Sequence, residues 1–200
     1  MNKAFKDAIV ARRSNYSLTN KSTLSDREIE ELVDLAVQYV PSAFNSQSTR
    51  IVLLLNEHHQ KFWNIVKQEL KKVASEEGYL HAEAKIDHSL ASGYGTILFF
   101  EDERVVKGLQ ENFVPYADHF PKWAQQTSAM HQYVLWVGLA DAGLGASIQH
   151  YNPVIDDAVR QEWNIDENWT LIAQMPFGVA SASPEEKPAQ PLNGRIKVFK

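Results

Sequence analysis

Thr96-Ile97-Leu98-Phe99-Phe100 is the apolar run that decides which fold the sequence predicts. A short run without alternation of apolar and polar residues is typical of a strand that is covered on both faces of a sheet. The run follows Gly93-Tyr94-Gly95 and ends at Glu101-Asp102-Glu103, where we expect the chain to return to solvent. It therefore predicts the buried centre of a sheet.

Two further runs, one on each side in the sequence, predict neighbouring strands. Ile51–Leu55 is equally apolar and is predicted to be a strand buried on both faces. Trp169–Gln174 predicts a third strand, after which Met175–Gly178 is expected to turn out of the sheet. Arg195–Phe199 is a possible further strand without a local partner. It ends an arm rich in proline and charge, residues 181–200, which is a candidate for wrapping another subunit.

Helical periodicity fills the segments between these strands. Ser25 and Glu28 form a capping box, after which apolar residues recur at intervals of three and four until Pro41. A long segment from Trp123 towards Gly143 is apolar on several sides, as expected of a helix that is central or lies at a subunit interface. Shorter helices are predicted over 5–9, over 62–73, in the polar stretch before Gly93, and from the N-cap pair Asn152-Pro153 to Trp163.

The alternation of helices and strands is typical of an α/β or α+β chain with a sheet between layers of helices. The length of 200 residues predicts a single domain, residues 1–200, and argues against separate cofactor and substrate lobes. Lysine and arginine number 20 against 25 aspartates and glutamates, and the net charge of −5 gives no footprint for nucleic acid or an anionic membrane. A local basic pocket stays open as a hypothesis.

The absence of cysteine excludes disulfides, thiol nucleophiles and thiolate metal sites. The N-terminus lacks the apolar core of a signal peptide, and the longest apolar stretch, near Tyr133–Ala140, is too short to span a bilayer. We therefore expect a cytoplasmic protein. No glycine-rich nucleotide loop, H-E-x-x-H or G-x-S-x-G motif occurs, and the histidines show no metal-ligand spacing, so we expect no metal site.

Three polar segments interrupt the apolar elements with groups suited to an anionic, hydrogen-bonding ligand. Arg12-Arg13-Ser14 offers two permanent cations and a hydroxyl, which suit a phosphate. Pro41–Ser48 carries amides and hydroxyls that can donate and accept. Gly143–Pro153 contains glycines that let a planar ligand approach the backbone. Each segment alone is equally well interpreted as an ordinary turn or capped loop.

Together these segments resemble the nitroreductase family of flavin enzymes, and within it the branch of the fatty acid repression mutant protein. The resemblance covers nearly the whole chain. The two longest matching blocks are the most specific. The residues that carry it are Arg12-Arg13-Ser14, Pro41-Ser42-Ala43-Phe44-Asn45-Ser46-Gln47-Ser48, Gly95–Asp102, Phe120-Pro121-x-Trp123, Gly143–Pro153 and Glu186-Lys187-Pro188.

The resemblance implies an α+β homodimer with a three-layer fold, an FMN in each of two sites at the interface, and the C-terminal arm reaching the partner. It places the phosphate and ribityl chain on Arg12, Arg13, Ser14 and the late Lys187. The remaining implied contacts are Pro41, Ser42, Ala43, Asn45 and Gln47 from the other subunit, the segment Ser147, Ile148, Gln149 and His150 near the ring, and Phe120 with Trp123 as an aromatic cover over the substrate side.

The implied activity is that of an NAD(P)H oxidoreductase in which the flavin carries the chemistry and no side chain is catalytic. NADH or NADPH would donate a hydride, and a nitroaromatic or similar small-molecule acceptor would then take it, in a ping-pong cycle. Two alternatives stay open. One is a flavin-binding regulatory or stress-response protein, linked to lipid signalling or oxidative stress, with incidental turnover. The other is a binding module without flavin.

The sequence departs from the family pattern in two places. Many nitroreductases carry a basic residue two places after the serine, where this chain has Tyr16. The phosphate would then depend more on Arg12, Arg13 and Lys187, while Tyr16 packs on the flavin or at the dimer face. The chain is also short, which leaves little room for an inserted lid and predicts an open site.

Overall fold

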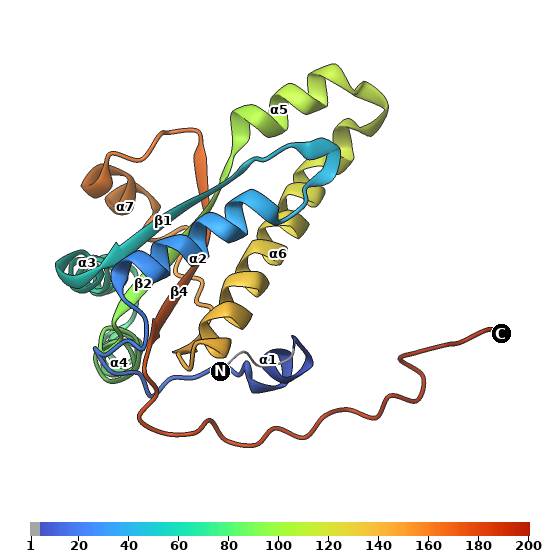
Figure 1. Cartoon of the computed structure of the whole chain (residues 1–200). Helices are drawn as coiled ribbons and strands as arrows, with labels where there is room; N and C mark the ends of the chain where they lie inside the picture. Colours follow the sequence, from blue (N-terminus) through green and yellow to red (C-terminus); the bar gives the residue numbers. More distant parts are fainter. Residues whose placement is uncertain (1–4) are drawn as a thin grey trace.

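The structure is a computed structural model that describes residues 5–200, and it is an α+β fold (Figure 1). The strands are β1 (Thr49–Leu55), β2 (Gly95–Asp102), β3 (Gly145–Ala146) and β4 (Trp169–Gly178). The α-helices are α1 (Phe5–Ala11), α2 (Asp26–Tyr39), α3 (Asn56–Val73), α4 (Glu76–Lys85), α5 (Glu103–Asn112), α6 (Phe120–Asp141) and α7 (Asp156–Trp163). Short helical turns, η1 (Ala43–Asn45), η2 (Ile86–Leu90) and η3 (Val114–His119), complete the order.

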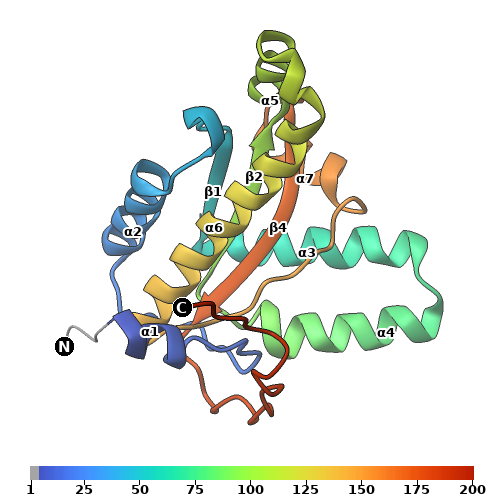
Figure 2. The same cartoon turned by 90° about the vertical axis from the view of Figure 1, so that its right-hand side faces the viewer.

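The sheet has the order β1-β2-β4-β3, and every neighbouring pair is antiparallel. β2 is central and buried along its whole length, as its apolar run predicts. Ile97 and Phe99 face a core shared with α2 and α6, whereas Leu98 and Phe100 face a second core shared with α3 and α7. Figure 2 shows the resulting three layers, with α2 and α6 on one side of the sheet and α3 on the other.

β4 corrects the expected end of the third strand. The strand does not turn out after Gln174, because Met175–Gly178 continues the antiparallel pairing with the start of β2, and Met175 and Phe177 fill the core under α6. A bulge opposite Phe99 and Phe100 displaces the register, so that Leu171 faces the opposite core from Ala173 although the two are two positions apart.

The end of β2 is a second correction. Glu101 and Asp102 do not return to solvent, since they stay in the strand and are only 1% and 3% exposed. β1 is less buried than predicted. It is a strand at the edge of the sheet, and most of its side chains are half-buried rather than buried on both faces.

The helices largely follow their sequence signals. The capping box of Ser25 and Glu28 is formed, and α2 ends before Pro41. The expected N-cap at Asn152 is wrong: the Asn152–Pro153 peptide is cis and belongs to a turn, and α7 begins only at Asp156. α6 is the longest helix of the described chain, and none of the helices described is long and apolar enough to cross a bilayer.

The C-terminal arm leaves the domain as an extended segment (Figure 1). Residues 195–199 do not join the sheet, Ile196 forms only an isolated bridge with Asn193, and the side chains of 195–199 are exposed. Its apolar side chains Leu192, Ile196, Val198 and Phe199 are each more than half exposed in the single chain. The arm's proposed reach to a partner stays a prediction at this point.

Candidate functional site

A cavity of about 600 Å³ lies where the chain leaves α1, and we call it the basic pocket. α1 ends at Ala11, and the following residues run beside β3, with the Asn15 amide donating to the Ala146 carbonyl at 2.9 Å. The start of the C-terminal arm crosses over the same segment. The lining residues are Arg12, Arg13, Ser14, Asn15, Tyr16, Ser17, Ser183, Pro184, Glu185 and Lys187.

Arg12 is held in the pocket by an aromatic ring rather than by a carboxylate. Its guanidinium carbon lies 4.3 Å from the ring centre of Trp136 on α6, a cation–π contact. Its Nε is buried and has no hydrogen-bond partner. Within residues 5–200, neither Arg12, Arg13 nor Lys187 forms an ion pair. The pocket therefore presents positive charge that no ion pair among the described residues neutralises, which suits an anion.

Arg13 ties the arm to the pocket. Its Nη2 donates to the main-chain carbonyl of Glu185 at 2.5 Å, and the Asn15 side-chain amide donates to the carbonyl of Ala182 at 3.2 Å. These bonds bring Lys187, far away in the sequence, to the same cavity as Arg12. The predicted basic set is thus assembled in the single chain.

Lys85 is a site residue that the sequence analysis missed. Its Nζ donates to Gln149 Oε1 at 3.0 Å and lies 5.8 Å from the ring centre of Tyr16. Gln149 in turn donates to Ser147 Oγ at 3.0 Å. Lys85 ends α4 just where the backbone widens into the π-helical turn η2, a feature common at functional sites. No sequence motif marks a lone lysine at a helix end, so only the fold shows it.

Ser147 and Gln149 are buried, Ile148 is half-buried and His150 is exposed. The Gln149 amide donates to the Gln174 carbonyl at 2.7 Å, which fixes this segment beside β4. Lys85 thus connects Gln149 of this segment with the ring of Tyr16.

The polar loop, residues 41–48, lies elsewhere and has an unusual backbone. Phe44, Asn45 and Gln47 all have positive φ values of 56°, 51° and 49°. For a bulky residue such as Phe44 this conformation is a true outlier, and such strain concentrates at functional sites. The Gln47 amide donates to Ser42 Oγ at 3.0 Å, which closes the loop on itself.

An aromatic cluster holds Phe44 in this conformation. Its ring contacts Phe113, Tyr116, Phe120 and Trp123 at centroid distances from 4.8 to 6.0 Å, and it stacks on Trp123. Phe120 is only 3% exposed and packs with Val106 and Ala124, so it is a core residue in the single chain. Trp123 is half-buried, stacked also on exposed His119.

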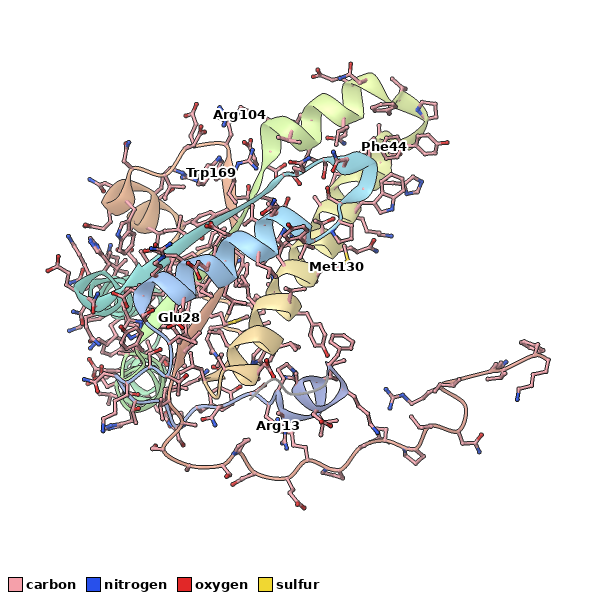
Figure 3. All side chains as sticks on the ribbon, viewed as in Figure 1. Arg13, Glu28, Phe44, Arg104, Met130 and Trp169 are labelled. Atoms are coloured by element: carbon pink, nitrogen blue, oxygen red, sulfur yellow. The ribbon has the colours of Figure 1, made fainter. Side chains whose placement is uncertain are left out.

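The basic pocket and the polar loop lie near opposite ends of α6, as the labels of Arg13 and Phe44 show in Figure 3. The loop contacts Trp123 in the first turn of α6, whereas Arg12 lies over Trp136. Thirteen residues of helix at 1.5 Å each separate these two tryptophans by about 20 Å. None of residues 41–48 lines the basic pocket. One chain therefore does not bring the two predicted halves of the site together.

The family model of the nitroreductases matches residues 9–179, and the chain belongs to this family. Two Saccharomyces cerevisiae proteins are similar in sequence. HBN1 is 34% identical over 181 residues, covering 90% of this chain and 89% of HBN1. The nitroreductase FRM2, the fatty acid repression mutant protein, is 32% identical over 197 residues, covering 98% of this chain and 96% of FRM2. The predicted family and branch are confirmed.

Solved structures agree with the fold. The nitroreductase CinD from Lactococcus lactis in complex with nicotinic acid has a TM-score of 0.90 and 41% identity, over 98% of this chain and 100% of that one. CinD has also been solved with chloramphenicol and with 4-nitrophenol. A nitroreductase with bound FMN from Desulfitobacterium hafniense DCB-2 shares the fold at a TM-score of 0.71 and 13% identity, over 99% of this chain and 100% of that one.

Proposed function

We propose that this protein is an FMN-dependent NAD(P)H oxidoreductase that reduces nitroaromatic or similar electron-poor acceptors. The observation that carries the proposal is the basic pocket, where Arg12, Arg13 and Lys187, none of them in an ion pair within the described residues, line a cavity of about 600 Å³. The volume and donors fit a phosphate-bearing cofactor of the size of FMN. Family membership, and the FMN and nitroaromatic ligands of the relatives, support the same assignment.

The chain's own residues would bind and orient the cofactor. Arg12, Arg13 and Lys187 hold the phosphate through charge-assisted hydrogen bonds, and Ser14 reaches the ribityl chain. Ser147, Ile148, Gln149 and His150 lie towards the ring, with Tyr16 beside them. The residues that would complete the contact from a second chain are Pro41, Ser42, Ala43, Asn45 and Gln47.

When bound, FMN supplies the hydride chemistry, accepting from NADH or NADPH and passing on to the acceptor in a ping-pong cycle. Lys85 contributes positive charge next to Gln149 and Tyr16, and this cation favours the negative charge that reduction adds. We place the acceptor beside the aromatic cluster, where Trp123 and the His119 stacked on it would border the acceptor.

We further propose a homodimer in which each site takes the basic pocket from one chain and the polar loop from the other. The separation of about 20 Å along α6 supports this arrangement. A second support is the exposed apolar groove between α2 and α6, lined by Leu35, Tyr39, Pro41, Met130, Tyr133 and Val134. The whole chain acts as one FMN-binding domain, with residues 181–200 as an arm to the partner.

The proposal is tested on the purified full-length protein. We expect a yellow protein with a flavin absorption band, a dimer mass in light scattering, and oxidation of NADH or NADPH when a nitroaromatic is supplied. A colourless protein that fails to take up added FMN would contradict the assignment. Rapid reduction of bound FMN without any efficient acceptor would favour the regulatory alternative, and a monomer at micromolar concentration would contradict the shared site.

A further inference from the structure

Glu101 is a buried carboxylate that the proposed function does not use. It is 1% exposed and lies at the end of β2, directly opposite Thr49 in the register of β1 and β2. Its Oε2 accepts a hydrogen bond from Ser48 Oγ at 2.6 Å, and its Oε1 accepts one from Thr49 Oγ1 at 2.6 Å. The carboxylate thus binds the last residue of the polar loop and the first residue of β1.

No cation compensates this carboxylate directly. Arg50 and Arg104 both form ion pairs with Asp102, at 3.1 and 3.2 Å, and within the described residues Glu101 has no ion pair of its own. Burial raises the pKa of Glu101, against the lowering effect of the two hydroxyl donors. A buried carboxylate without a cation is unfavourable for stability unless hydrogen bonds compensate it. The presence of Glu101 at this buried position is therefore better explained by its hydrogen bonds to Ser48 and Thr49.

Glu101 and its neighbour act on the same loop from two sides. The Asp102 amide donates to the Ser48 carbonyl at 2.9 Å. Arg50, oriented by Asp102, donates from Nη1 to the Gln47 carbonyl at 2.7 Å. These bonds fix the end of the loop at Gln47 and Ser48, shortly after Phe44 and Asn45, and the positive φ of all but Ser48 costs free energy unless the surroundings enforce it.

We propose that Glu101 is a positioning residue that holds the polar loop in its FMN-binding conformation through Ser48 and Thr49. The inference rests on the proposed function and adds to it a residue that touches neither cofactor nor acceptor. The aromatic cluster around Phe44 holds the middle of the loop, and Glu101 holds its end. Without the carboxylate, residues 42–47 relax out of the strained backbone and lose the fixed directions of their amides.

The test uses the full-length protein with two readouts, amide hydrogen exchange in residues 42–49 without FMN and the FMN dissociation constant from flavin fluorescence. We expect Glu101→Leu to speed exchange in the loop and to weaken FMN binding, each about tenfold. Glu101→Gln is the conservative rescue, because its amide accepts from one hydroxyl and donates to the other, and it keeps both readouts within about threefold. Ser48→Ala with Thr49→Val removes the two hydroxyl donors instead of the carboxylate and should have the same effect on both readouts. It replaces Glu101→Leu in the test if that variant does not fold.

Thr96→Val is the matched control. Thr96 is buried on the same strand, where its hydroxyl bonds Trp63 and His59, and it does not touch the loop. This variant lowers the urea midpoint but leaves loop exchange and FMN affinity unchanged. The proposal is overturned if Glu101→Leu leaves both readouts unchanged, or if Thr96→Val changes them equally. Failure of the wild-type protein to bind FMN sinks the proposed function, whereas the exchange data still decide whether Glu101 holds the loop.

Discussion

The basic pocket and the polar loop are both polar interruptions of an apolar chain, yet they are built in opposite ways. The pocket gathers Arg12, Arg13 and Lys187 from exposed segments and leaves Arg12 with an unsatisfied donor. The loop satisfies its own hydroxyls and carbonyls through Ser42, Glu101 and Arg50. The basic pocket thus holds cations without a bound anion, whereas the polar loop is already fixed by its own hydrogen bonds.

This difference teaches how the two halves contribute to binding. A charged pocket contributes affinity, because charge-assisted hydrogen bonds are the strong ones. A strained loop that is fixed in advance contributes orientation, because no ordering is needed on binding. Mutations in the two regions should therefore differ in size and in kind.

Removing charge from the basic pocket has the largest expected effect. Arg12→Ala combined with Lys187→Ala deletes two phosphate contacts, each worth about 1.5–3 kcal/mol, and should weaken FMN binding roughly a hundredfold or more. The flavin fluorescence titration measures it. Arg27→Ala with Lys71→Ala removes the same charge from exposed positions on α2 and α3 and should leave the dissociation constant nearly unchanged. Equal losses in both pairs would show that the effect is general electrostatics and not a phosphate site.

Neutralising Glu101 tests the loop by its pH dependence and has the smallest expected effect. Because burial raises its pKa, the folded protein binds this proton more tightly than the unfolded chain, so Glu101 lowers stability as the pH rises through that raised pKa. Glu101→Gln does not titrate. We expect it to be more stable than wild type at pH 8 by roughly 1 kcal/mol or less, with the gap closing as the pH falls into the usual carboxyl range.

Urea unfolding at a series of pH values measures this gap. Arg12→Ala leaves Glu101 and its surroundings unchanged, so this comparison variant should not reproduce the pH dependence of the gap. If the stability of Glu101→Gln instead rises relative to wild type as the pH falls, the ionised carboxylate stabilises the fold.

Much of the fold follows from the sequence because its signals are local. The capping box at Ser25, the apolar run of β2 and the stop at Pro41 depend on neighbours along the chain, and each was found where predicted. The continuation of β4 past Gln174 depends on pairing with distant β2, and the cis peptide at Pro153 depends on tertiary packing. Neither carries a local pattern.

The candidate site divides in the same way. The basic residues Arg12 and Arg13 could be predicted because charge interrupts an apolar chain, and Lys187 because of the family pattern. Lys85 and Glu101 could not, because a lysine at a helix end and an acid at a strand end usually face solvent. Only the antiparallel register that sets Glu101 against Thr49, and the approach of α4 to Gln149, turn them into site residues.

The central claim is that each site joins the basic pocket of one chain to the polar loop of another, and mixed dimers test it directly. One differently tagged chain carries Arg12→Ala with Lys187→Ala. The other carries Asn45→Gly with Gln47→Gly, which removes both side chains at positions whose positive φ glycine adopts without strain. Both variants alone should bind FMN poorly.

The measurement is the FMN content of the purified mixed dimer. In a two-fold symmetric dimer with shared sites, one site receives both defects and the other receives none, so the mixed dimer should regain half of the wild-type FMN at wild-type affinity. If each chain instead built its own site, both sites would keep one defect and no high-affinity FMN would return. That result would contradict the account.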